Sequence, residues 1–158
     1  MDSASGKKVR QKPPDHNQQR NVIRIWELNS DAAPVSLEGP LGPVVTSAVS
    51  PDGRYIGVIT KLSARIYDLS NSSYFDFDFI KLLKLPGFQS GASLTFADGV
   101  FVLTADQHWA VADSKTGEIL HFGVIKTSGI YSNSVVSDSD KWRVALGLAD
   151  GTVGIYEV

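Results

Sequence analysis

Short runs of apolar residues, mostly β-branched or aromatic, alternate with polar turn residues along most of the chain. In residues 44–69, three such runs are separated by the turn Asp52-Gly53 and by a short polar break at 60–63. Glycine reaches positive φ without a Cβ clash, so an Asp-Gly pair between apolar runs is typical of a hairpin. The pattern predicts a three-stranded antiparallel meander.

The last run of this unit recurs along the chain. Measured between Trp26, Tyr67, Ala112 and Tyr156, its spacings are 41, 45 and 44 residues. The turn after the first strand also recurs, at residues 50–53, 96–99 and 137–140. A period of about 40 to 45 residues with four short strands per unit is typical of propeller blades.

The aromatic-acid pairs that close three of these runs carry a resemblance to the WD40 family. They stand where that family has its Trp-Asp dipeptide, and Ala112-Asp113 is a weaker version. The pairs are Trp26-Glu27, Tyr67-Asp68 and Tyr156-Glu157. The resemblance covers roughly residues 21–158 and implies a β-propeller fold.

The Gly-His dipeptide of that family has no counterpart in this sequence. The three histidines, His16, His108 and His121, follow Asp, Gln and Leu. The hydrogen-bonded network that the family builds on this histidine is therefore not carried over. We interpret the repeats as divergent blades that are held mainly by packing.

The predicted fold class is all-β, with WD40-like β-propeller blades, each a four-stranded antiparallel sheet, in an incomplete ring. Residues 1–20 are expected to form a disordered basic leader, and residues 21–158 a partial propeller of about three blades. Its expected parts are the outer strands of a first blade at 22–43, a blade at 44–86, a blade at 87–123 and a blade lacking its outer strand at 124–158. Outer strands are predicted at 34–37, 81–85 and 118–122.

The strand pattern also predicts which side chains fill the space between blades. They are the large apolar residues on the central strands: Ile25, Trp26, Val58, Ile66, Tyr67, Leu103, Val111, Leu146 and Ile155.

A set of strands of this size does not close a ring, and unpaired edge strands are templates for further pairing. We therefore expect other polypeptide to complete the propeller. The alternatives are a different protein chain, a second copy of this chain, or the rest of a longer protein.

The stretch 75–79 alternates strictly between aromatic and acidic residues. A period of two places Phe75, Phe77 and Phe79 on one strand face. Asp76 and Asp78 then lie on the other face. One interpretation is an outer strand whose rings pack on the next blade, because aromatic residues usually bury. The other is an exposed edge that binds a partner, since aromatic residues are enriched at binding hot spots.

Charge is unevenly distributed. The net charge is −2, while residues 1–20 carry +3, which leaves −5 on the remainder. The basic residues Lys7, Lys8, Arg10 and Lys12 lie close together in the leader. They fit a nuclear-import or nucleic-acid contact, or alternatively a solvated leader or inter-blade loop. The acidic body does not suggest a nucleic-acid-binding blade surface.

Motifs for catalysis, cofactors, metals or membranes are not found in the sequence. There is no cysteine, no phosphate-binding glycine loop, no Gly-x-Ser-x-Gly and no metal-ligand spacing around the histidines. No apolar run approaches the 18 or so residues of a membrane span. The lipid-binding Phe-Arg-Arg-Gly of phosphoinositide-binding propellers is missing. We therefore expect no enzymatic activity, no cofactor, no small-molecule substrate and no membrane association.

The function we expect is a non-enzymatic protein–protein interaction scaffold in a multiprotein assembly. A nuclear or nucleolar setting, in RNA processing or ribosome building, is favoured over the cytoplasm by the basic cluster. The alternative is an RNA- or DNA-associated propeller whose basic leader contacts phosphates.

Overall fold

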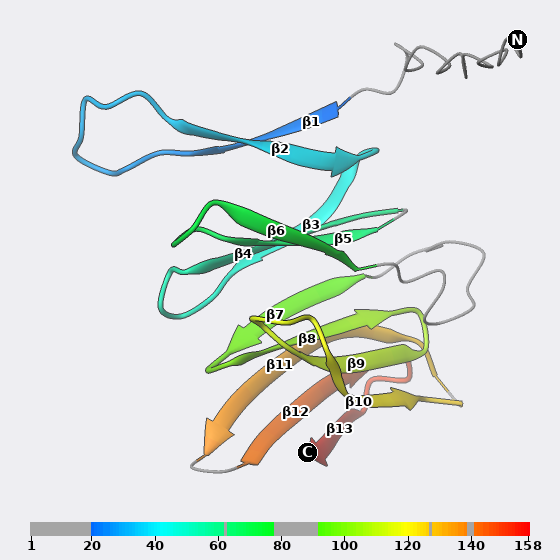
Figure 1. Ribbon diagram of the computed structural model, residues 1–158. Coiled ribbons are helices and arrows are strands. Elements are labelled where there is room, and N and C mark those ends of the chain that lie inside the picture. The colour runs from blue at the N-terminus through cyan, green and yellow to red at the C-terminus, as the bar shows by residue number, and fades with distance from the viewer. Residues whose placement is uncertain (1–19, 62, 78–91, 127, 139–140) are drawn as a thin grey trace, which may run out of the picture.

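The computed structural model describes residues 20–61, 63–77, 92–126, 128–138 and 141–158, and in these ranges the chain is all-β without a helix. Figure 1 shows the strands gathered into sheets that follow one another in a row from the N-terminal to the C-terminal end. Over the described strands the row is open, and none of these sheets closes on itself.

Four antiparallel sheets follow each other in chain order, and each uses consecutive strands. The first sheet pairs β1 (Arg20–Ile25) with β2 (Val35–Leu41). The second has the order β3 (Val44–Val49), β4 (Tyr55–Thr60), β5 (Ala64–Asp68) and β6 (Ser73–Phe77). The third has the order β7 (Ser93–Ala97), β8 (Val100–Ala105), β9 (His108–Asp113) and β10 (Ile119–Val124). The fourth has β11 (Ile130–Asp138), β12 (Lys141–Leu148) and β13 (Val153–Glu157).

The predicted fold class is confirmed: the second and third sheets are four-stranded antiparallel blades, and the set is not closed. One strand position was wrong. The outer strand of the second sheet was predicted at 81–85, which lies outside the described residues, whereas β6 at Ser73–Phe77 takes that place beside β5. The bidentate ion pair between Arg65 and Asp76 fixes this register.

Tight turns link the first two strands of the second and third sheets. Gly53 and Gly99 adopt positive φ values of 71° and 74°, which a side chain would disfavour. In the first of these turns, Asp52 Oδ1 accepts the Arg54 N–H at 3.0 Å and the Ser50 hydroxyl. The Asp-Gly pairs of the sequence therefore act as turn residues.

The hydrophobic core lies between the sheets in three layers. Tyr67 and Val58 face the first sheet and pack with Ile25. On the opposite face of the second sheet, Ile66 packs in the layer shared with the third sheet. The last layer, between the third and fourth sheets, contains Val111 and its neighbours. A sheet therefore has both faces buried only if another sheet packs on each of them.

Most of the predicted core is confirmed. Buried residues of that set are Val58, Ile66, Tyr67, Leu103, Val111 and Leu146, and Ile25 is half-buried. The prediction was wrong for Trp26 and Ile155, which are 63% and 72% exposed. Both lie at the ends of the row, Ile155 on β13 and Trp26 directly after β1, where no described sheet covers the outward face.

Candidate interaction surfaces

The third strands of the sheets are equivalent in register, and this defines two faces for every sheet. Each third strand ends in an acidic residue, which pairs with a residue of the second strand of its own sheet. These acidic residues are Asp68, Asp113 and Glu157. The residue before each acid faces the preceding sheet: these residues are Tyr67, Ala112 and Tyr156. The residue two positions before each acid points to the opposite face: Ile66 and Val111 face the following sheet, and Ile155 faces outward, where no described sheet covers it.

The outward face of the fourth sheet carries uncovered apolar side chains, and we refer to it as the Ile155 face. Val153 and Ile155 on β13 are 66% and 72% exposed, and Ile155 pairs across the strand with Ala145 on β12. Charged residues border this face, since Lys141 and Arg143 both pair with Glu157. The face is thus an apolar strip with a charged end.

The opposite end of the row has an outward face of its own, the Trp26 face. Exposure alternates along the strand: Ile23 and Ile25 turn inward to the second sheet, whereas Val22, Arg24 and Trp26 turn outward. Trp26 stands one residue after Ile25, as Tyr67 stands one residue after Ile66. The two ends therefore present opposite faces of the same repeating interface.

The outer edge of β13 is the second uncovered feature of the fourth sheet. Trp142 and Val158 exchange both backbone hydrogen bonds, at 3.1 and 2.9 Å, so every second residue of β13 bonds to β12. The N–H and C=O groups of Val153, Ile155 and Glu157 consequently point away from β12. No described strand pairs with them, whereas β6 and β10 occupy this position beside β5 and β9.

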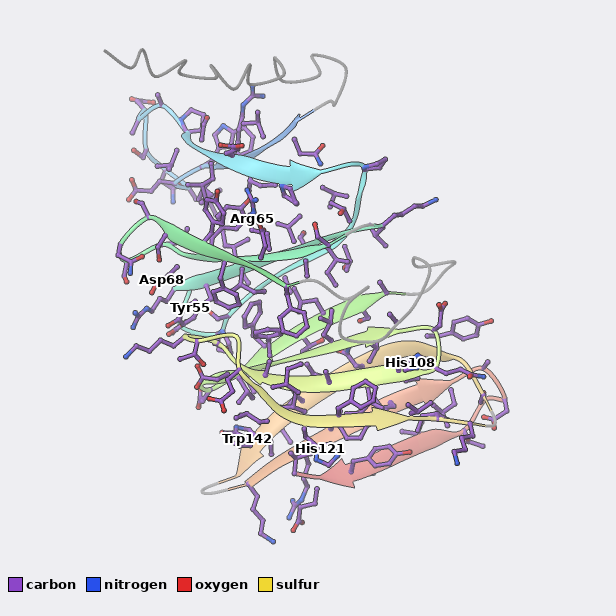
Figure 2. The ribbon with its side chains drawn as sticks, turned by 45° about the vertical axis from the view of Figure 1, so that its right-hand side comes forward. Tyr55, Arg65, Asp68, His108, His121 and Trp142 are labelled. Atoms are coloured by element: carbon purple, nitrogen blue, oxygen red, sulfur yellow. The ribbon has the colours of Figure 1, made fainter. Side chains whose placement is uncertain are left out.

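An aromatic cluster lies beside this open edge. The buried Trp109 ring stacks on His121 from β10 and tilts against Tyr156 from β13, each with ring centroids 4.9 Å apart. His121 itself is exposed, and Figure 2 shows it on the side of the third sheet that faces β13. A strand added to β13 would lie next to these rings as well as along the open hydrogen-bonding edge.

The predicted aromatic-acidic strand falls partly within the described residues. Phe77 is buried edge-on against Phe101, with centroids 6.0 Å apart, and Phe75 packs against the same layer half-buried. The Asp76 carboxylate accepts both its hydrogen bonds from Arg65, at 2.6 and 2.8 Å. These contacts fit the packing interpretation for this part of the strand; Asp78 and Phe79 lie outside the described residues.

The basic cluster of Lys7, Lys8, Arg10 and Lys12 lies outside the described residues. The nucleic-acid alternative thus rests on sequence alone.

Two aspartates near strand ends, Asp68 and Asp150, accept hydrogen bonds within turns. The pKa of Asp68 is held well below its ordinary value, first by the Arg54 guanidinium and then by the Ser70 hydroxyl. The pKa of Asp150 is lowered by hydrogen bonds from the Thr152 hydroxyl and N–H. Such carboxylates stay ionised as acceptors. Among the described residues, no group of three acidic, His or Cys side chains is placed to hold a metal ion, and no helix is long and apolar enough to span a membrane.

Two structural residues were missed from the sequence. Asn133 on β11 reaches across to the third sheet, where its amide donates to the Ser93 carbonyl and the Thr104 hydroxyl. Arg65 reaches in the other direction and donates to the Glu38 carbonyl at 3.2 Å. The sequence does show that Asn133 is a polar residue at an inward strand position. It does not show which residues Asn133 bonds to, because these partners lie 29 and 40 residues away in the sequence.

Comparison with known proteins adds support for the fold. No family model matches the chain, and no curated protein matches it. One similar solved structure is the crystal structure of the computationally designed Ika8 protein, with a TM-score of 0.65 and 19% identity. The match covers 87% of this chain and 40% of that one, so this chain spans well under half its length. At this identity, what the two share is the fold.

Proposed function

We propose that this chain is a non-enzymatic protein-interaction module built from WD40-like blades, and that another polypeptide completes it. The observation that carries the proposal is the open edge of β13, with its outward N–H and C=O groups at Val153, Ile155 and Glu157. An exposed strand edge with unpaired N–H and C=O groups is a ready template for strand addition.

The complete blades indicate the chemistry of the added strand. β6 and β10 are antiparallel strands of five and six residues that carry an apolar or aromatic residue at most positions. In the third sheet, Ile119 of β10 pairs with Ala112 and packs into the layer shared with the second sheet. A strand on β13 would place the corresponding residue opposite Tyr156, beside the Trp109–His121 stack. The preferred partner is therefore an extended segment with an apolar residue at that position.

The scaffold role follows from the arrangement of the remaining surface. Asp68 and Asp150, whose carboxylates are held at low pKa, accept hydrogen bonds within turns, and rigid blades hold the loops at both ends of the strands. Membership of a larger assembly, and the nuclear setting suggested by the basic leader, belong to this proposal.

The test uses a labelled synthetic peptide with the β10 sequence Ile119–Val124 and fluorescence anisotropy. Ile155→Pro removes one outward N–H while leaving every β12 bond in place, because Ile155 does not bond to β12. We expect the peptide to bind the unmodified chain and to lose at least about fivefold in affinity on Ile155→Pro, the effect of roughly one hydrogen bond.

Ile155→Val, which keeps the N–H and the apolar side chain, is the matched control and should bind as the unmodified chain does. A proline-containing version of the peptide should not bind. Equal binding by Ile155→Pro and Ile155→Val would show that the peptide is not held by the β13 edge, and the proposal would be withdrawn.

A further inference from the structure

The repeated register that relates the sheets also relates the two ends of the row. Across the first layer, Ile25 lies in the cluster that contains Tyr67. Across the last layer, Val111 lies in the cluster that contains Tyr156. In both layers, an aliphatic residue on one strand (β1 or β9) lies with an aromatic residue on the equivalent strand of the next sheet (β5 or β13). Ile155 and Trp26 are the aliphatic and aromatic members of this pairing that have no described neighbour.

We propose that the Ile155 face of one copy of this chain packs on the Trp26 face of a second copy, head to tail. This deepens the proposed function, on which it rests, by naming the partner and the surface. The contact would continue the series of inter-sheet layers, with Trp26 of one copy taking the place that Tyr67 and Tyr156 occupy within the chain.

The distribution of side-chain size over the Ile155 face fits this partner. Large exposed apolar side chains lie on both edge strands of this face, Val153 and Ile155 on β13 and Val136 on β11, whereas β12 presents the small Ala145 and Gly147 between them. The first sheet is a two-stranded pair with two apolar outward residues, Val22 on β1 and Trp26 directly after it. Two strands placed over β13 would cover Val153 and Ile155, the two most exposed apolar side chains of β13.

The contact is heterologous, since the two faces differ and each copy keeps one of each. Such contacts repeat until a ring closes, or continue as an open chain. A two-fold dimer, in which the same patch meets itself, would require Ile155 to meet Ile155 and would leave Trp26 uncovered.

The test is complementation between two surface variants, followed by light scattering with in-line chromatography. Trp26→Asp leaves the Ile155 face intact, and Ile155→Asp leaves the Trp26 face intact together with all β13 backbone donors. Each variant alone should remain at the monomer mass of 17.1 kDa, because a carboxylate now lies in its only self-contact. An equimolar mixture should give a species of twice that mass and nothing larger, since only one productive contact is left.

Val49→Asp is the matched control, because Val49 is 59% exposed on β3 and belongs to neither face. It should self-associate as the unmodified chain does. Circular dichroism should give all three variants the same β signal, because the substituted side chains are exposed.

Either of two results would overturn the head-to-tail arrangement: self-association that survives both single substitutions, or a mixture that stays at monomer mass. Peptide binding at the β13 edge tells the two proposals apart. Binding of the peptide without complementation rejects the second copy and keeps the interaction module, whereas loss of both rejects the module too.

Discussion

Replacing Phe101 by alanine should lower the free energy of unfolding by about 3 to 5 kcal/mol, the usual effect of emptying a fully buried phenyl site. Phe101 on β8 has no exposed surface and touches two other rings, Phe77 at 6.0 Å and Phe96 at 5.8 Å between centroids. These three rings join β6, β7 and β8 in the layer between the second and third sheets. Its loss therefore weakens the contact between the two complete blades.

Urea denaturation followed by circular dichroism measures this effect. The matched control is Tyr131→Ala, which removes a ring that is 68% exposed and should change the unfolding free energy by less than about 0.5 kcal/mol. A loss below about 1 kcal/mol for Phe101→Ala would mean that the two sheets do not share a packed layer.

Replacing Asn133 by leucine should lower the free energy of unfolding by about 2 to 3 kcal/mol, because it leaves several inward polar groups without partners. The Asn133 amide donates to the Ser93 carbonyl at 3.2 Å and to the Thr104 hydroxyl at 3.3 Å, and its oxygen accepts from Thr95. These bonds connect the inner strands of the third and fourth sheets.

A double-mutant cycle with Thr95→Val isolates the shared part of this effect. Thr95 and Asn133 are in contact, so the two losses should not add, with a coupling of about 0.5 to 3 kcal/mol. Additive losses would indicate that the side chains act separately, contrary to the hydrogen bonds in the structure.

The strands and their grouping were accessible from the sequence because both follow from short-range rules. β-branched and aromatic runs bounded by Asp-Gly turns specify hairpins, and the repeat of about 40 to 45 residues specifies how the hairpins group into blades. Residues such as Ile66 and Val111 were correctly predicted as core, since their equivalents in each unit carry the same kind of side chain.

The exposure of Trp26 and Ile155 was not accessible by the same route. A periodic pattern states which face of a sheet a residue occupies, and it states nothing about whether a neighbouring sheet covers that face. Tyr67 and Trp26 hold equivalent positions, yet one is 2% exposed and the other 63%. The difference comes from the number of sheets packed around them.

Pairings between distant polar side chains were also beyond the sequence. The alternation at 75–79 correctly separated Phe77 from Asp76 by face, but the choice of Arg65 as the partner of Asp76 depends on the register of β6 against β5. The bonds of Asn133 to Ser93 and Thr104 depend on how two sheets are placed face to face. Such contacts require the tertiary arrangement before they can be predicted.

The central claim is that the two ends of this row of blades are complementary surfaces through which copies of the chain associate. The most direct measurement is the molar mass of the unmodified chain by light scattering over a concentration series. The account predicts a mass that rises with concentration above the 17.1 kDa of one chain. A mass that stays at 17.1 kDa throughout, together with cooperative unfolding at every concentration, would contradict it.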